Sequence, residues 1–339
     1  MSLRMTVVGS WWPQADCERD LQRYHAGELA PAEGREVLNR AAAKAIQEQR
    51  ELGFTEWTGG EYFAFHFIEH LQRLVSGIRI EVPSKKELFD YDDLALARIT
   101  GKVEVSGPLG YAEAYRRESQ LKGGVSKATV VGPTEVAINV LGELPALRPH
   151  IGGLVRSINK EIRELEAAGC AHVQLDIPTC AALITNNAMT AEETAQIVAG
   201  CFEGVKKCRR GIHICSGNLC GRPLSGNLSC APWADVIERL DGVIDVAHLA
   251  VHYFHQYLER DVLKRIPRSI ELAAGIVDEA SYGLESVEKI RERAAAWAKV
   301  VGEERLWLAP SCGFGRHPLR SIPLLRQKME NMAEAAATF

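Results

Sequence analysis

Short apolar runs rich in β-branched residues alternate along the chain with longer segments in which apolar residues recur at helical spacing. The short runs predict eight strands, at residues 6–8, 54–58, 129–131, 171–175, 212–214, 243–246, 273–277 and 306–308. Amphipathic segments separate most of these strands and predict helices, for example at residues 32–52, 151–168, 191–207 and 284–301. Eight strand–helix units predict an α/β fold, a (β/α)8 barrel. The alternative, a doubly wound open sheet, is weakened because no Gly-x-Gly-x-x-Gly turn follows the first strand.

One stretch interrupts the alternation after the second unit. Residues 78–82 and 99–105 read as two further strands, so we expect an inserted β-hairpin at about residues 78–105. The chain contains neither a low-complexity linker nor a short-period repeat. The sequence therefore predicts a single domain over residues 1–339.

Composition and charge narrow the class of protein. The 339 residues are 46% hydrophobic and 25% charged, with a net charge of −4, which argues against a nucleic-acid binder. No apolar run reaches the length of about 20 residues that a membrane crossing requires, and the N-terminal residues do not resemble a signal peptide. We therefore expect a cytoplasmic protein that does not bind membranes. The nine cysteines are an odd number, which argues against a disulfide framework.

Polar residues gather where the predicted strands end. They are Ser10, Glu61, Asp176, His213, Cys215, Asp278 and Cys312. In a barrel these strand ends surround one mouth, where catalytic groups collect, so residues far apart in the sequence can meet there. Among the acids, Asp176 and Asp278 are the candidate catalytic groups.

A metal site is the strongest chemical indication. His213 and Cys215 are two residues apart on a predicted strand and so point to the same side. Cys312 ends the last strand, which reaches the same mouth. One histidine and two cysteines suit Zn²⁺, with a fourth position left for substrate or another ligand. The alternative is a pair of buried thiols beside a hydrogen-bonded core histidine.

The motifs around these residues resemble the cobalamin-independent methionine synthase family, specifically its catalytic barrel and the short single-barrel relatives. The resemblance covers nearly the whole chain. It rests on Val8-Gly9-Ser10-Trp11-Trp12-Pro13, Glu51-Leu52-Gly53 leading to Gly59-Gly60-Glu61, Gly132-Pro133, Gln174-Leu175-Asp176-Ile177-Pro178, His213-x-Cys215 and Cys312-Gly313.

The resemblance implies a zinc-dependent alkyltransferase that methylates a thiol, usually homocysteine. It implies that Ser10 and Glu61 hold the amino-acid end of the thiol and that Asp176 reaches its ammonium. A thiol is mostly protonated at neutral pH, and zinc deprotonates it while keeping the sulfur nucleophilic. The methyl donor stays open between methylfolate, a methyl corrinoid carried by another protein, and a small molecule.

Three departures from the family pattern bear on the donor and the metal. Ala250 stands where the family supplies a fourth zinc ligand, a Glu, so His248 or His252 is the candidate substitute, with His255 and Cys220 as weaker ones. Ile177 replaces the Glu of the Asp-Glu-Pro motif, and Ala280 replaces a His that helps to protonate the leaving folate. Together they disfavour methylfolate.

Two rival functions remain open. An epoxyalkane:coenzyme M transferase resembles the same barrel and keeps the His-x-Cys…Cys pattern, but its sulfonate acceptor should recruit Arg or Lys, whereas Glu61 and Asp176 favour an ammonium-bearing thiol. A non-catalytic barrel that binds zinc or an amino acid is the other rival. It would hold homocysteine without turning over any methyl donor.

Overall fold

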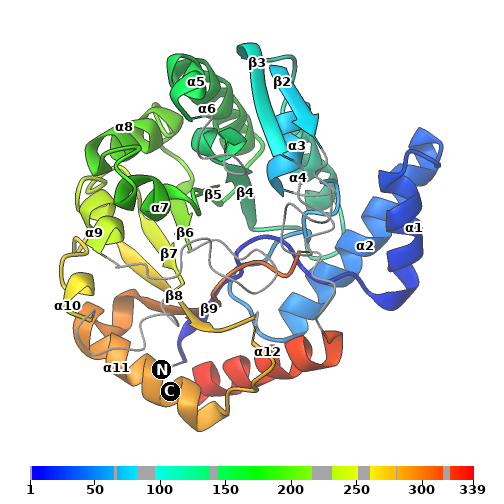
Figure 1. The fold of residues 1–339 in the computed structure, drawn as a ribbon. Coiled ribbons are helices and arrows are strands. Elements are labelled where there is room, and N and C mark those ends of the chain that lie inside the picture. Colours follow the sequence, from blue (N-terminus) through cyan, green and yellow to red (C-terminus); the bar gives the residue numbers. More distant parts are fainter. Residues whose placement is uncertain are drawn as a thin grey trace.

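A curled parallel sheet of seven strands occupies the centre of the molecule, and helices surround it (Figure 1). The computed structural model describes residues 2–64, 67–81, 96–137, 144–215, 231–250, 260–279, 281–315 and 321–339. The strands of this sheet lie in the order β1 (Arg4–Met5), β9 (Leu306–Pro310), β8 (Glu271–Val277), β7 (Val246–Leu249), β6 (Arg209–Ile214), β5 (His172–Asp176) and β4 (Lys127–Val131). All neighbouring pairs are parallel, so their carboxyl ends meet at one face.

Residues 54–60 form hydrogen bonds to both edge strands of the sheet, β1 and β4. On one side the Met5 carbonyl accepts hydrogen bonds from the N–H groups of Thr55 and Glu56, and on the other the Trp57 carbonyl accepts from Lys127. A single bridge pairs Ser10 with Gly60. The predicted strand at 54–58 is therefore wrong as a regular strand, because only isolated backbone bonds reach either neighbour.

Most helices pack around the outside of the sheet (Figure 1). The described helices are α1 (Ala15–His25), α2 (Pro31–Glu51), α3 (Phe67–Arg73), α4 (Tyr111–Ser119), α5 (Leu144–Leu147), α6 (Ile151–Ala167), α7 (Cys180–Thr185), α8 (Ala191–Cys201), α9 (Ala231–Glu238), α10 (Arg260–Leu263), α11 (Val287–Val301) and α12 (Ile322–Ala337). The chain ends lie side by side, and the Leu3 N–H donates to the Ala336 carbonyl over 3.0 Å.

A separate two-stranded sheet lies at the edge of the molecule beside α3 (Figure 1). β2 (Val75–Glu81) and β3 (Leu96–Val105) pair antiparallel, with an irregularity in the register between Ser76 and Ile78. Residues 82–95, which join them, lie outside the described residues. That this pair is an insertion into a barrel stays a prediction.

Several predicted boundaries shift. The strand expected at 243–246 lies at Val246–Leu249, because Val243 and Ile244 instead close the turn after α9 by donating to the Leu240 carbonyl. The strand expected at 6–8 is β1, two residues earlier. The helix expected over 191–207 ends at Cys201. In each case an apolar residue that the pattern assigns to a strand or helix is buried by side-chain packing, outside the regular hydrogen bonds of that element.

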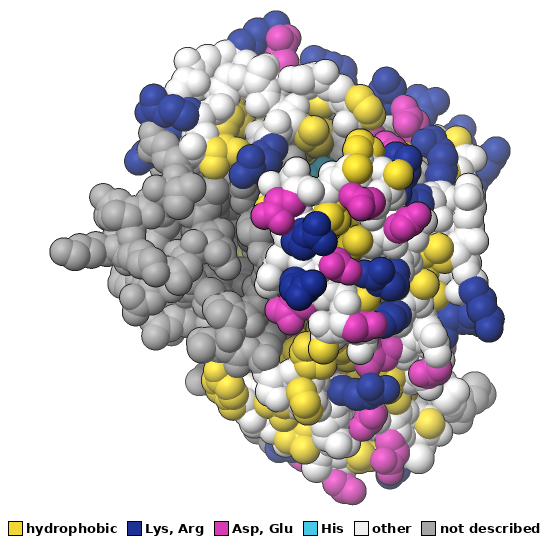
Figure 2. Space-filling model, turned by 90° about the vertical axis from the view of Figure 1, so that its right-hand side faces the viewer, with side chains coloured by type: hydrophobic (Ala, Val, Ile, Leu, Met, Phe, Trp, Pro, Cys, Tyr) yellow, Lys and Arg dark blue, Asp and Glu magenta, His cyan; other side chains and the backbone are white. Residues whose placement is uncertain are grey.

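The inward side of the sheet carries polar side chains as well as apolar ones. Buried polar residues on its strands are Lys127, Thr129, His172, Gln174, Asp176, His213 and His248. On the outer face drawn in Figure 2, Lys and Arg alternate with Asp and Glu. Among the described residues, no helix has both the length and the hydrophobicity that a membrane crossing requires. These buried polar side chains include residues of the candidate functional site.

Candidate active site

Three potential metal ligands meet at the carboxyl ends of β6 and β9. The ligand atoms of His213, Cys215 and Cys312 all lie within 4.8 Å of one another. His213 is 2% exposed, and neither ring nitrogen has a hydrogen-bond partner among the described residues. Burial, reinforced by the positive charge of Lys127, lowers the pKa of His213 to about 3. The ring is therefore neutral, which is the form that binds a metal.

A carboxylate fixes the loop that presents Cys312. The Cys312 N–H donates a hydrogen bond to Oε2 of Glu279 over 3.0 Å, and Glu279 is 2% exposed. Ser311 donates to the carbonyls of Gly275 and Val277 at 2.8 and 3.0 Å. Sequence reasoning missed Glu279 because it selected its neighbour Asp278. The available signal was a second acid directly after the strand.

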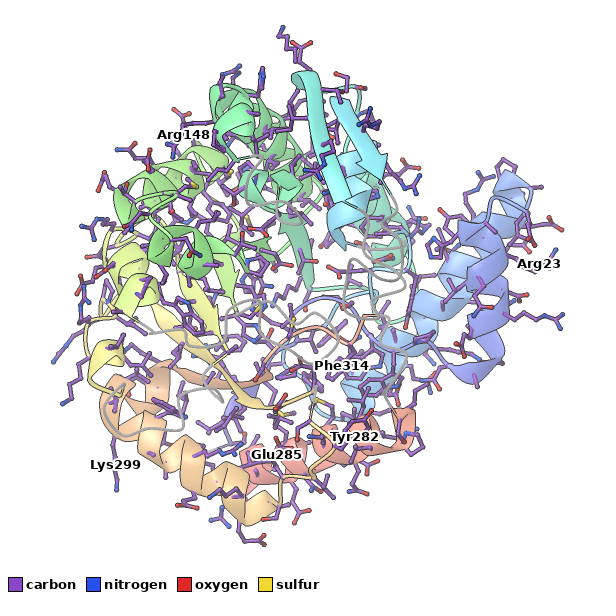
Figure 3. All side chains as sticks on the ribbon, viewed as in Figure 1. Arg23, Arg148, Tyr282, Glu285, Lys299 and Phe314 are labelled. Atoms are coloured by element: carbon purple, nitrogen blue, oxygen red, sulfur yellow. The ribbon has the colours of Figure 1, made fainter. Side chains whose placement is uncertain are left out.

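Ser10 lies against this same loop. Its carbonyl accepts a hydrogen bond from the Phe314 N–H over 3.1 Å, and a Cβ added at Gly313 would come within 2.3 Å of the Ser10 Oγ. Trp12 packs edge-on against Phe314 at 4.8 Å between ring centroids, and Figure 3 places Phe314 inside the ring of helices. The predicted substrate residue Ser10 is thus brought beside the metal group.

Glu61 occupies a tight turn directly after the bridge that pairs Ser10 with Gly60. It has a positive φ of 60°, unusual for a residue with a side chain, and it follows Gly60 with a φ of 88°. A Cβ at Gly9 would lie 2.4 Å from the Glu61 Oε1, so only glycine leaves room for this carboxylate. Burial, together with the negative charges of Asp176 and Glu118, raises the pKa of Glu61 to about 8.

Asp176 ends β5 and is held by a neighbour on its own strand. Gln174 donates from Nε2 to the Asp176 Oδ1 over 2.7 Å and to the Val8 carbonyl over 3.1 Å. Burial raises the pKa of Asp176, while the Gln174 hydrogen bond and the charge of Lys127 oppose that shift. Asp176 and Glu61 therefore form an acid pair whose charges interact.

Sequence reasoning missed two further buried titratable residues near this pair. Lys127 is 2% exposed and donates from Nζ to the Thr6 Oγ1 over 3.3 Å and to the Val7 carbonyl. Glu135 has no exposed surface and accepts from the Thr179 hydroxyl over 2.7 Å. A lysine inside an apolar strand and an acid after Gly-Pro were the available signals.

Two further predicted residues, His248 and Asp278, are described but are not members of the group of three ligands. His248 is fully buried and donates from Nε2 to the Pro310 carbonyl over 2.8 Å, with its ring edge-on to His213 at 4.8 Å between centroids. Asp278 ends β8, where its N–H donates to Glu285 and its carbonyl accepts from Lys328. His252, His255, Cys220 and Ala280 lie outside the described residues. The roles of His248 and Asp278 stay predictions.

A parallel sheet with His, two Cys and an acid pair at its carboxyl ends fits a metal-dependent group-transfer enzyme. Residues 3–338 match the family model described as "Cobalamin-independent synthase, Catalytic domain". The chain therefore belongs to the cobalamin-independent methionine synthase family, whose members are methyltransferases.

Similar proteins agree over almost the full length. A methionine synthase of Pyrococcus horikoshii is 24% identical over 334 residues, which covers 98% of this chain and 91% of the relative. A methionine synthase of Saccharolobus solfataricus is 25% identical, with 98% and 93% covered. In fold, the chain is similar to a B12-independent methionine synthase from Shewanella sp. W3-18-1 solved with selenomethionine. That similarity has a TM-score of 0.74 at 19% identity and covers 99% of this chain and 97% of the other.

Proposed function

We propose that this protein is a zinc-dependent methyltransferase that methylates the thiol of homocysteine. The observation that carries the proposal is the group of His213, Cys215 and Cys312, with a buried imidazole that has no hydrogen-bond partner among the described residues. One nitrogen and two sulfur ligands that leave a position open are typical of a catalytic zinc site. Zinc bound there would lower the pKa of the acceptor thiol and hold its sulfur as a nucleophile.

The acid pair supports an acceptor that carries an amino group. Glu61 and Asp176 are two carboxyl groups close enough to interact, and an ammonium group between them would relieve their mutual repulsion. A sulfonate acceptor of the coenzyme M kind would instead face two carboxyl groups, which offer it no positive charge. Ser10, Glu61 and Cys312 are also the partly exposed members of an otherwise buried site, so a substrate can reach them.

The chemistry of methyl transfer restricts which methyl donors the protein can use. The acceptor sulfur forms a bond to the methyl carbon while the bond from that carbon to the leaving group breaks, and the leaving group keeps the electron pair. Methylfolate leaves as an amine that must gain a proton, and Ala280 replaces the His that serves this purpose in the family pattern. We therefore propose a more activated methyl donor. The family's description as cobalamin-independent gives no support to a corrinoid partner.

The fold proposal is a (β/α)8 barrel in which residues 54–60 take the place of the second strand. It is supported by the hydrogen bonds from this segment to both edges of the sheet. In the same proposal β2 and β3 form the inserted hairpin.

Metal binding is tested by replacing single cysteines at the two ends of β6. Cys215→Ser removes one proposed ligand, whereas Cys208→Ser removes a buried thiol from the opposite end of the strand. We expect wild type and Cys208→Ser to hold one zinc per chain, with Zn–S distances of about 2.3 Å by X-ray absorption. We expect Cys215→Ser to lose most of the metal. Unchanged zinc content and affinity in Cys215→Ser would contradict the assignment.

A further inference from the structure

The strained turn at Glu61 is held from the middle of β4. Thr129 is 6% exposed, and its hydroxyl donates a hydrogen bond to the Glu61 Oε1. Gly9 completes the arrangement, because a Cβ there would lie 2.8 Å from the Thr129 Oγ1 and 2.4 Å from the Glu61 Oε1. The Glu61 carboxylate is therefore fixed on one side by one donor side chain and by a backbone segment without a side chain.

The surroundings of Glu61 make this donor important. Asp176 and Glu118 both act on Glu61 as negative charges, whereas Lys127 acts as a positive one. Lys127 and Thr129 are two residues apart on β4 and so lie on the same side of the strand. A hydroxyl that donates to a carboxylate favours its charged form and fixes its orientation. The Thr129 hydroxyl and the Lys127 charge thus both oppose neutralisation of Glu61.

We infer that Thr129 is a specificity-determining positioning residue, whose hydroxyl fixes the Glu61 carboxylate toward the amino group of the acceptor thiol. Thr129 itself does not touch the substrate. The inference rests on the proposed function, since it assigns Glu61 to the acceptor's ammonium. It explains why a polar side chain stands within the apolar run Ala128-Thr129-Val130-Val131.

The test compares two thiols that differ only in the amino group. Homocysteine and 4-sulfanylbutanoate share the thiol and the carboxylate, and their dissociation constants are measured on the zinc-loaded protein by calorimetry. Thr129→Val keeps the β-branched shape without the donor, and Thr129→Ser keeps the donor. Zinc content and melting temperature are recorded for each variant.

We expect Thr129→Val to weaken homocysteine binding by about tenfold, which matches the loss of one charge-assisted hydrogen bond. Binding of 4-sulfanylbutanoate should change by less than about twofold, because this thiol lacks the amino group that Glu61 would hold. Thr129→Ser should restore the wild-type preference. Equally weakened binding of both thiols would indicate that Thr129 only packs, and would overturn the inference. An unchanged preference for homocysteine would overturn it as well.

A second variant keeps the inference testable if Thr129→Val does not fold. Gly9→Ala displaces the same carboxylate from the other side, and we expect it to lose the preference for homocysteine as well. Retained preference in Gly9→Ala would count against the positioning of Glu61. A wild-type protein that binds zinc but neither thiol contradicts the proposed function, whereas a preference that survives the substitutions contradicts this inference alone.

Discussion

Glu135 is a carboxyl group enclosed where β4 and β5 end. It lies in the short 3-10 helix Pro133–Ala137, and its Oε2 has no hydrogen-bond partner among the described residues. Burial raises the pKa of Glu135 to about 8, against the hydrogen bonds from Thr179 and Thr134 that favour the charged form. The folded protein therefore holds this group neutral over a pH range in which the unfolded chain ionises it.

This shift predicts a pH-dependent effect of Glu135→Gln. Below pH 4.5, the ordinary value for a glutamate, the carboxyl is protonated in both states. As the pH rises from 4.5 to about 8, ionisation favours the unfolded chain and stability is lost. Glutamine avoids that loss, so we expect Glu135→Gln to gain about 1–3 kcal/mol relative to wild type between pH 5 and pH 8. Urea denaturation at both pH values measures it.

Glu203→Gln is the matched control, because Glu203 is exposed. Its effect on the free energy of unfolding should stay within about 0.5 kcal/mol at both pH values. An effect of Glu135→Gln that is the same at pH 5 and pH 8 would show that the carboxyl is not held neutral by burial.

At the scale of elements, the loop after β9 joins the metal group to Ser10. Gly313 follows Cys312, and a Cβ there would lie 2.3 Å from the Ser10 Oγ and 3.6 Å from its backbone nitrogen. Close approach of the two segments therefore depends on glycine at this position. A side chain would have to push apart the ends of β1 and β9.

We expect Gly313→Ala to weaken zinc and homocysteine binding together, each by about tenfold, since it displaces Cys312 and Ser10 from each other. Competition with a chelator measures the first and calorimetry the second. Gly107→Ala is the control, because nothing lies within 4 Å of a Cβ at Gly107. Wild-type affinities in Gly313→Ala would mean that the two segments are independent.

The sequence predicts elements best where a strand is buried on both faces. The predicted strand 171–175 nearly coincides with β5, in which Val173 and Leu175 alternate with polar residues and every residue is buried. Segment 54–58 is also predicted as a strand, yet isolated backbone bonds and the turn at Gly60 and Glu61 replace regular pairing there. Such irregular pairing depends on the neighbouring strands, which no local pattern encodes.

The residues of the site also divide into those that the sequence predicts and those that depend on contacts between distant segments. His213, Cys215 and Cys312 could be predicted as a group because strand ends converge in a parallel sheet. Glu279 and Thr129 could not, since their roles depend on contacts with Cys312 and Glu61 across long stretches of chain. Residue type and spacing find groups that bind ligands. They do not find the residues that hold those groups in place.

At the scale of the whole molecule, the site draws on almost the entire chain. Ser10 lies in the segment that follows β1 and Cys312 in the loop that follows β9, with Glu61, Asp176 and His213 between them in sequence. The main cluster of buried residues likewise runs from Leu3 to Ala336. A single domain over residues 1–339 stays a prediction, and it is the one that this distribution favours.

The departures of this sequence from the family pattern predict which methyl donor the protein uses. Ile177 and Ala280 stand where the family pattern has an acid and a histidine. A leaving amine then lacks these groups, so we expect methylfolate to yield little or no methionine. Turnover of methylfolate at about 1 s⁻¹ or faster, as in working enzymes, would contradict this expectation. Steady-state rates with methylfolate and with activated methyl donors measure the difference.

The most direct test of the account is methionine formation by the zinc-loaded protein from homocysteine and isotopically labelled methyl donors, read by mass spectrometry. The donors are methylfolate, a methyl corrinoid and small activated methyl compounds, and Cys215→Ser and Cys208→Ser are assayed beside the wild type. We expect labelled methionine from an activated donor with wild type and Cys208→Ser, and none with Cys215→Ser. Stable binding of zinc and homocysteine without labelled methionine from any donor would contradict it.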